Sequence, residues 1–220
     1  MNFENKTVIV TGGSQGIGEA ICNKLFEQGA NIIVFDINKC NEKFEYYKVD
    51  IRDEEQIKAA IKNIKKVDIL INNAGVYFEK NIEETSIDDL NTMVDINIKG
   101  TYLVIKNVIN KIKETKGNIV NIASCLGVVP ELTSPLYCTT KAGIIMLTKC
   151  LAQEYADIGI RINCVLPGPI DTPLLQKQII TIEARDKCSK RIPIKRIGTP
   201  EEVANVVSFL ASEEASYVTG

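Results

Sequence analysis

The sequence predicts an α/β fold, namely a single-domain, doubly wound parallel sheet of Rossmann-like type with helices on both faces. Five short segments rich in β-branched residues are apolar on both faces, as the strands of a sheet covered on each side must be. Longer helical patterns separate them, which favours parallel strands joined by right-handed crossovers. The 220 residues suit one domain, 1–220, and leave little room for a second.

The elements follow in chain order. The predicted strands span residues 7–10, 32–35, 67–71, 118–122 and 161–166. The predicted helices span residues 17–28, 54–64, 88–113, 137–157 and 200–211. The last helix has a start signal, since Thr199 can cap it, Pro200 suits its first position and Glu202 its third. Segment 171–198 alternates charged and apolar residues after the last strand, and we expect it to form a flap over the substrate.

The composition excludes several classes of function. Lys and Arg total 26 against 28 Asp and Glu, a net charge of −2, so no positive field is available for nucleic acid or an anionic membrane. Histidine is absent, which excludes Ser-His-Asp hydrolysis and removes the commonest metal ligand. We therefore expect a small-molecule substrate and no nucleic-acid, membrane or metal partner.

The cysteines and the first residues indicate a location. Seven cysteines are scattered and never spaced as Cys-x-x-Cys, a pattern typical of reduced thiols. The first residues have no basic region, and no apolar run is long enough for a signal peptide or a membrane span, so we expect neither. We expect a cytoplasmic protein.

Two of the predicted helices, 88–113 and 137–157, carry apolar residues nearly all round. Such helices must also be covered on their outer side. We expect a second copy of the chain to cover them, which predicts a homo-oligomer, either a tetramer or a dimer. In the alternative, the flap covers them within one chain.

A glycine-rich turn follows the first predicted strand and opens the first predicted helix. Gly12, Gly16 and Gly18 would let the backbone approach a pyrophosphate, and the first amides of the helix would point at the anion. Their spacing differs from the common G-x-G-x-x-G pattern, so an ordinary strand-to-helix turn is the alternative.

Asp36 ends the second predicted strand, where a carboxylate can accept hydrogen bonds from both hydroxyls of an adenosine ribose. The same charge would repel a 2′-phosphate. The neighbouring Gln15 and Ile37 are not basic, which favours NAD over NADP. The alternatives are that Asp36 starts a turn, or that Lys39 reverses the preference.

Without histidine, a proton must come from another perturbed group, and a tyrosine one helical turn from a lysine is a candidate. Two such pairs occur, Tyr102 with Lys106 and Tyr137 with Lys141. Ser124 precedes Tyr137 by 13 residues and follows a predicted strand, at the edge where open sheets place their sites. The equivalent position before Tyr102 is an Asp, so the second pair is favoured.

At this point the chain resembles the short-chain dehydrogenase/reductase family over essentially all 220 residues. The family hallmarks occur in order: the loop 11–18, Asp50, Asn72-Asn73-Ala74-Gly75, Asn97, Ser124, Tyr137, Lys141 and Pro167-Gly168. One departure is the segment 37–46, which is short and polar where the family commonly has a helix, so the adenine side is expected to be more open. In the family the chain also usually continues beyond 217–220 to a last strand and a tail at the subunit interface.

The resemblance implies a role for each matching residue. Tyr137 would be the general acid/base, Lys141 would hold the nicotinamide ribose and acidify the tyrosine, and Ser124 would orient the substrate oxygen. Asn97 would support a proton-relay water. The residues expected to bind the cofactor are Gly12, Ser14, Gln15, Gly16, Ile17, Gly18, Asp36, Asp50, Ile51, Asn73, Ala74, Gly75, Tyr137, Lys141, Pro167, Gly168, Ile170 and Thr172. Seen singly, Ser124 could be a cap or turn serine and Asn97 a buried, hydrogen-bonded amide.

The predicted function is an NAD-dependent oxidoreductase that moves hydride between nicotinamide and a secondary alcohol or ketone, with a lean toward a sugar or polyol. The polar and apolar mixture of the candidate substrate residues supports that lean; they are Tyr77, Glu79, Cys125, Glu131, Leu132 and Thr133. One alternative is a 3-oxoacyl-[acyl-carrier-protein] reductase, whose acidic carrier would need the basic residues of the flap, namely Lys187, Lys190, Arg191, Lys195 and Arg196. A catalytically silent NAD-binding regulator and a methyltransferase are further alternatives, neither of which needs Tyr137 with Lys141.

Overall fold

The computed structural model describes residues 1–220 and contains one six-stranded parallel sheet with the strand order β3-β2-β1-β4-β5-β6. The strands are β1 (Thr7–Thr11), β2 (Asn31–Asp36), β3 (Glu45–Lys48), β4 (Ile69–Asn72), β5 (Asn118–Ile122) and β6 (Arg161–Val165). The order runs outward from β1 in one direction and from β4 in the other. This reversal opens a crevice at the carboxyl ends of β1 and β4, and the predicted fold class is confirmed.

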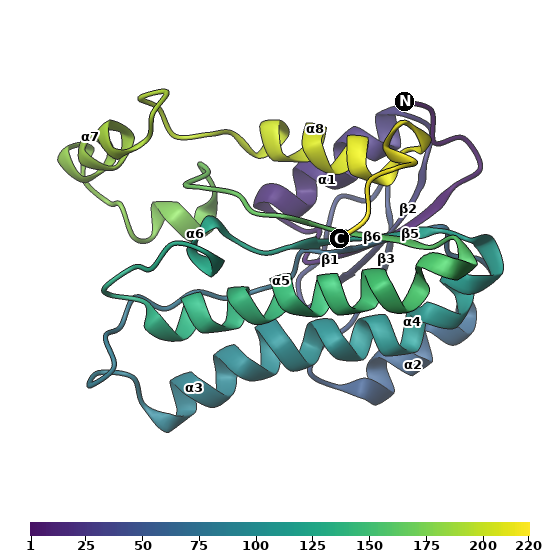
Figure 1. Ribbon diagram of the computed structural model, residues 1–220, viewed down its shortest axis with the longest axis horizontal. Helices are drawn as coiled ribbons and strands as arrows, with labels where there is room; N and C mark the ends of the chain where they lie inside the picture. The colour runs from purple at the N-terminus through teal and green to yellow at the C-terminus, as the bar shows by residue number, and fades with distance from the viewer.

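Helices cover both faces of the sheet (Figure 1). One face carries α1 (Gly16–Glu27) and α8 (Pro200–Ala211), and the other carries α2 (Glu54–Asn63), α4 (Thr101–Thr115) and α5 (Pro135–Tyr155). Successive strand residues point to opposite faces, so each strand feeds two cores. In β1, for example, Val8 and Val10 pack toward α1 and α8, whereas Ile9 packs toward α2 and α4.

The third strand was not among the segments predicted most clearly from the sequence. β3 is a polar edge strand that pairs with β2 alone, and its end residues Glu45 and Lys48 are exposed. The segment between β2 and β3 forms turns instead of a helix, as its short polar sequence predicts. An exposed edge strand lacks the apolar pattern by which the central strands are recognised.

The predicted helix 88–113 is a longer helical segment with a change of geometry in its middle. α3 (Ile87–Val94) leads into a π-helical turn, Asp95–Gly100, which leads into α4. A π-helical turn is rare and often marks a functional position. Asn97 lies within it and is fully buried.

The segment predicted as a flap contains two short helices, α6 (Pro173–Gln176) and α7 (Ile182–Arg191). Its two ends meet in a bridge between Ile170 and Gly198, and Asp171 N donates to Gly198 O over 2.9 Å. The segment projects from one end of the molecule (Figure 1). None of the helices combines the length and the apolar character needed to cross a bilayer.

Candidate active site

A cavity of about 1120 Å³ opens at the carboxyl ends of the strands, between the sheet and α6 and α7. Its walls come from the loops after β1, β2, β3, β4 and β5, from the segment after β6 and from the first turns of α5. The cavity is at least as large as usual small-ligand pockets of roughly 300–1,000 Å³.

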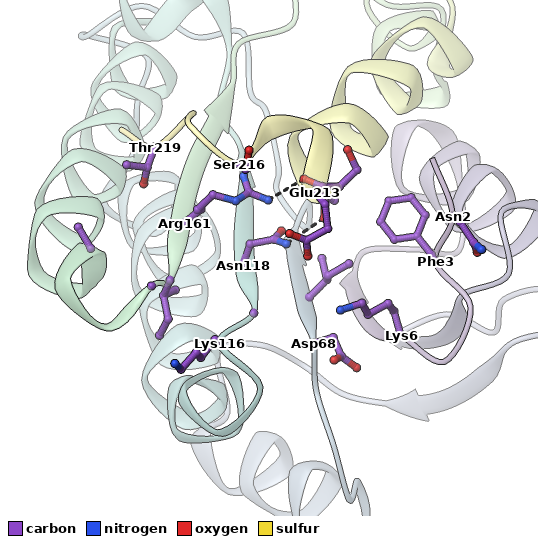
Figure 2. Close-up of a pocket in the computed structure, with 17 residues that line it drawn as sticks. Asn2, Phe3, Lys6, Asp68, Lys116, Asn118, Arg161, Glu213, Ser216 and Thr219 are labelled. Atoms are coloured by element: carbon purple, nitrogen blue, oxygen red, sulfur yellow. Dashed lines mark hydrogen bonds between the residues drawn. The ribbon is translucent and has the colours of Figure 1, made fainter.

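A smaller cavity of about 300 Å³ lies at the opposite edge of the sheet (Figure 2). There, Arg161 donates to the carbonyls of Leu210 and Ser212, each over 2.9 Å, and Asn118 Nδ2 donates to Ala211 O over 2.9 Å. These bonds hold the last residues of α8 and Ser212 against the amino ends of β5 and β6. None of the residues predicted as functional lines this cavity, so the larger one is the candidate site.

The glycine loop closes the end of the large cavity where α1 begins. Gly12 has a φ of +66°, and a Cβ there would lie 2.8 Å from Ala74 Cα. A Cβ on Gly18 would lie 2.0 Å from Gly12 O. Side chains are therefore excluded at both positions, because the loop and the start of α1 pack closely against neighbouring backbone. Gly12, Gln15, Gly16 and Ile17 line the cavity at this point. Such a cradle fits a pyrophosphate.

The turn after β4 is fastened to this loop through Asn73 and Thr11. Asn73 Nδ2 donates to Gly12 O over 2.9 Å, and Thr11 Oγ1 accepts from the amides of Asn73 and Ala74 over 3.0 and 3.1 Å. The two loops therefore form one rigid wall. This explains why Asn73, Ala74 and Gly75 can sit beside the glycine loop on the cavity surface.

Asp36 lies at the end of β2 and lines the cavity, with only 8% of its surface exposed. Its Oδ2 accepts from Ser14 N over 3.1 Å and its Oδ1 accepts from Asn38 N over 2.9 Å. Asp36 therefore does stabilise the start of a turn, as the alternative interpretation of this residue predicted. Each carboxylate oxygen can accept a further hydrogen bond, so the turn role leaves capacity for a ribose hydroxyl.

Arg52 is a cavity residue that the sequence analysis did not identify. It lies two residues after Asp50, and its Nε and Nη2 donate to the two Asp50 oxygens over 3.0 and 2.5 Å. This bidentate contact holds the pKa of Asp50 below its usual value and raises that of Arg52. Arg52 is therefore a basic residue of the cavity that comes from the loop after β3, and its guanidinium is paired with Asp50.

Tyr137 and Lys141 occupy the first turns of α5 and both line the cavity. The Nζ of Lys141 lies 5.6 Å from the centre of the Tyr137 ring and donates to Ile122 O over 3.0 Å. The other pair is at the surface, because Tyr102 is 53% exposed and Lys106 pairs with Glu54 over 3.0 Å. Burial thus separates two pairs that have identical spacing.

The protonation states of this pair follow from burial. Desolvation lowers the pKa of Lys141 to about 8, because no carboxylate offsets the loss of water. Desolvation also raises the pKa of Tyr137 above its ordinary value, and a hydrogen bond with Ser124 opposes part of that rise. In the protein alone, the phenol is therefore protonated at neutral pH. A positive charge near the ring is what would make it acidic.

Asn97 does not line the cavity, and its side chain is saturated by protein contacts. Its Oδ1 accepts from Val76 N over 2.8 Å, and its Nδ2 donates to Val76 O over 2.9 Å and to Thr140 Oγ1 over 3.2 Å. The alternative of a buried, hydrogen-bonded amide therefore describes this side chain. Through these hydrogen bonds, Asn97 links the π-helical turn to the loop after β4 and to α5.

Most of the residues predicted for the site gather around the one cavity. Ser124 lines it, and so do all the residues predicted to bind the cofactor except Ser14 and Gly18, which lie in the loop behind it. Among the candidate substrate residues, Leu132 is 90% exposed and stays outside, whereas the others line the wall. The flap contributes residues that include Leu174, Gln178, Lys187, Cys188 and Arg191.

The comparisons with known proteins agree with this arrangement. Residues 12–220 match the family model described as Enoyl-(Acyl carrier protein) reductase. The chain is 36% identical to the 3-oxoacyl-[acyl-carrier-protein] reductase of Thermotoga maritima over 237 residues, covering 100% of this chain and 96% of that protein. It is 38% identical to glucose 1-dehydrogenase 2 of Bacillus subtilis over 241 residues, covering 100% of this chain and 92% of that protein.

A solved structure shows the same fold. The ligand-free aldohexose dehydrogenase of Thermoplasma acidophilum superposes with a TM-score of 0.94 at 34% identity, covering 98% of this chain and 90% of that chain. Fold and site thus define a Rossmann-type oxidoreductase of the class that uses nicotinamide nucleotides. The chain belongs to the short-chain dehydrogenase/reductase family.

Proposed function

We propose that the protein is an NAD-dependent dehydrogenase that transfers hydride between the nicotinamide and a secondary alcohol or ketone. One observation carries the proposal. Ser124, Tyr137 and Lys141 reach the same cavity whose other end is closed by the glycine loop and Asp36. The reacting groups and the cradle for a dinucleotide are therefore joined in one continuous space.

The chain's own residues supply the proton chemistry and the orientation. When bound, the nicotinamide supplies the site that gives or takes the hydride. Tyr137 Oη would take the proton of an alcohol, or return it to a ketone oxygen, and Ser124 would hold that oxygen. A phenol with a pKa of about 10 must be lowered by roughly three units, about 4 kcal/mol, to act at neutral pH. The ammonium of Lys141 can supply part of this by stabilising the phenolate.

Replacing Tyr137 by Phe should abolish turnover while leaving the fold intact. We expect kcat to fall by at least about 100-fold, the usual contribution of a general acid/base. The measurement follows reduced nicotinamide by absorbance with a panel of sugars, polyols and a 3-oxoacyl thioester.

The matched control is Tyr102→Phe, which removes the phenol of the surface pair with the same spacing and should leave kcat unchanged. Undiminished turnover in Tyr137→Phe would reject the mechanism. A wild-type protein that binds NAD but turns over nothing in the panel would favour a silent regulator.

The NAD preference rests on Asp36, whose charge would oppose a 2′-phosphate. Asp36→Ala should raise the ratio of NADP to NAD in kcat/KM by about tenfold or more, the effect expected when one repulsive contact is lost. Asp157→Ala, on the surface, is the control. Solved neighbours are divided on this point: ElxO is seen with NADP bound, at a TM-score of 0.90, 34% identity and coverage of 97% and 94% of the two chains. A Brucella melitensis 3-ketoacyl-(acyl-carrier-protein) reductase is seen with NADH. It has a TM-score of 0.90 and 30% identity, and the match covers 98% of this chain and 94% of that chain. An unchanged ratio would contradict the role given to Asp36.

For the substrate, we favour a sugar or polyol. Glu79 and Thr133 lie together on the cavity wall, where Thr133 Oγ1 donates to Glu79 Oε1 over 3.1 Å, and both can bind hydroxyl groups. The glucose and aldohexose dehydrogenases among the relatives support this choice. The second candidate is a 3-oxoacyl-[acyl-carrier-protein] reductase, which the Thermotoga relative favours.

The basic residues of the flap give the second candidate limited support. Arg191 lies 3.6 Å from Glu131, Arg196 pairs with Glu202, and Lys190 pairs with Asp186. Of the five, only Lys187 and Arg191 line the cavity. Carboxylates of the same chain thus neutralise much of the patch that an acidic carrier would need.

A further inference from the structure

The side chain of Tyr77 contacts that of Tyr137 on the wall of the candidate active site. The two rings meet edge to face, with centres 4.7 Å apart and planes inclined at 80°. This geometry is the attractive one for two aromatic rings. Tyr77 therefore covers one side of the phenol to which the proposed mechanism assigns proton transfer.

The side chain of Tyr77 is fixed at its outer end by Ser134. The oxygens of the Tyr77 hydroxyl and Ser134 Oγ lie 2.6 Å apart. Ser134 is the residue before α5 and is 1% exposed, yet its side chain makes no capping hydrogen bond to that helix. Because serine at this position usually caps its helix, a hydroxyl turned instead to Tyr77 indicates a role in holding that ring.

The backbone next to Tyr77 is fixed as well. Asn97 binds both the N–H and the C=O of Val76, and it also donates to Thr140 Oγ1, which itself donates to Tyr137 O over 2.9 Å. The hydrogen bonds and the ring contact form a closed circuit from Asn97 through Val76 and Tyr77 to Tyr137 and back through Thr140. Neither ring can turn without breaking a member of this circuit.

We propose that Tyr77 is a positioning residue that holds the Tyr137 ring in its reactive orientation and keeps water from one of its sides. This inference rests on the proposed function, since it assigns Tyr77 to the same reaction. Tyr77 makes no proton transfer itself. Its phenol is bound to Ser134 and acts through the ring of Tyr137.

Several titratable groups face Tyr137 from the elements packed against it. Lys141 and Cys138 lie on its own helix, Cys125 lies on the turn after β5, and Tyr77 lies on the loop after β4. Ser124 adds an uncharged hydroxyl. Replacing Tyr77 by Leu leaves the others in place and removes both the cover that the ring provides and the charge of the Tyr77 phenolate, each of which raises the pKa of Tyr137.

The first test uses the hydrogen bond between Tyr77 and Ser134. Tyr77→Phe and Ser134→Ala each remove this bond, and each should lower kcat by about three- to tenfold, the range for one neutral hydrogen bond, with little change in KM. Because both changes remove the same contact, the double variant should be no slower than the slower single variant. Tyr217→Phe, at a fully exposed position, is the control. Multiplying effects in the double variant would overturn the proposal.

The second test does not depend on turnover. Tyrosinate absorbance is titrated in Tyr77→Leu and in Tyr77→Leu/Tyr137→Phe, and the difference between the curves reports Tyr137 alone. The matching difference between wild type and Tyr137→Phe gives the reference. Water admitted by the leucine should lower the pKa of Tyr137 toward its ordinary value of about 10. An unshifted titration would overturn the proposal. If the wild type proves inactive and Tyr77→Leu still shifts the pKa of Tyr137, only the proposed function is overturned.

Discussion

Lys141 is a charged side chain held in the interior without a carboxylate partner. It is 5% exposed, and its only hydrogen bond within the protein is to Ile122 O. Such a residue weakens the folded state, because the ammonium loses its water when the chain folds. A catalytic use of the ammonium would explain why the protein keeps a buried charge that lowers its stability.

The variant Lys141→Met should therefore be inactive and yet more stable near neutral pH. The folded-state pKa of about 8 lies below the ordinary lysine value of 10.5, so the unfolded chain binds more protons between these values. Wild-type stability accordingly rises with pH across that window, and the full penalty applies below it. Removing the charge should raise the free energy of unfolding at pH 7 by about 1–3 kcal/mol, less any loss from the bond to Ile122.

Urea unfolding of the cofactor-free protein at pH 7 and pH 10.5 measures this difference. The gain should be present at the lower pH and largely gone at the higher one. Lys106→Met, which removes an exposed lysine, should show no such dependence. A Lys141→Met protein that is less stable than wild type at pH 7 would contradict the burial argument.

The placement of single residues was predicted where chemistry and spacing coincide. Ser124, Tyr137 and Lys141 reach one cavity, as expected from their joint offsets. The Tyr-x-x-x-Lys spacing by itself did not separate this pair from Tyr102 and Lys106, since that distinction lies in burial. Arg52 was missed because the loop after β3 brings it to the cavity, and the sequence does not show the path of that loop.

Among the elements, the π-helical turn Asp95–Gly100 is the one that most affects the site. It places Asn97 where its amide can bind both backbone groups of Val76. Gly100 allows the turn to pack closely, because a Cβ there would lie 2.7 Å from the side chain of Ile51. The turn thus supports the loop after β4, which carries Tyr77.

Replacing Asn97 by Leu should destabilise this region and slow catalysis together. The N–H and C=O of Val76 would lose their partner, and each unsatisfied buried group costs about 1–3 kcal/mol. We expect a loss of about 2–4 kcal/mol in the free energy of unfolding, measured by urea denaturation, and a lower kcat at temperatures where the variant is folded.

The control for this change is Asn107→Leu on α4, where the asparagine is half-buried and bonds to Glu54 and Leu103 O. It should have a smaller effect on stability and none on kcat. Equal losses for the two variants would show that Asn97 has no special place in the fold.

Elements with strong apolar patterns were predicted at close to their observed bounds, including β5 and α8. The helix containing Asn97 was predicted as regular, because its sequence keeps a helical pattern through the π-helical turn. That turn depends on bonds to Val76 and on packing against Ile51, which are distant in the chain. β3 was not assigned because a polar edge strand has no buried pattern to recognise.

For the whole molecule, the outer faces of α4 and α5 are exposed and carry apolar side chains. Tyr102 and Met146 are 53% and 59% exposed on these faces. The segment with α6 and α7 lies elsewhere, at one end of the molecule, and leaves them uncovered (Figure 1). The alternative in which the flap covers both helices is therefore wrong, and a homo-oligomer stays the prediction.

Met146→Glu should weaken such an oligomer. A carboxylate on the apolar face would lose its water in the interface, so the variant should dissociate at concentrations where wild type is assembled. Size-exclusion chromatography with light scattering gives the mass of each. Lys62→Glu, on α2, is a control for the added charge. A wild type that is monomeric throughout would contradict the prediction.

The bridge between Ile170 and Gly198 bears on how the cavity wall can change. The chain leaves the framework and returns to it at almost the same point, so the excursion between can be lengthened, shortened or rewritten while the spacing of the strands stays as it is. The residues proposed for proton transfer, Ser124, Tyr137 and Lys141, lie after β5 and on α5, outside that excursion. Changes confined to residues 171–198 can therefore reshape the part of the cavity wall that this segment forms and leave the residues proposed for proton transfer in place.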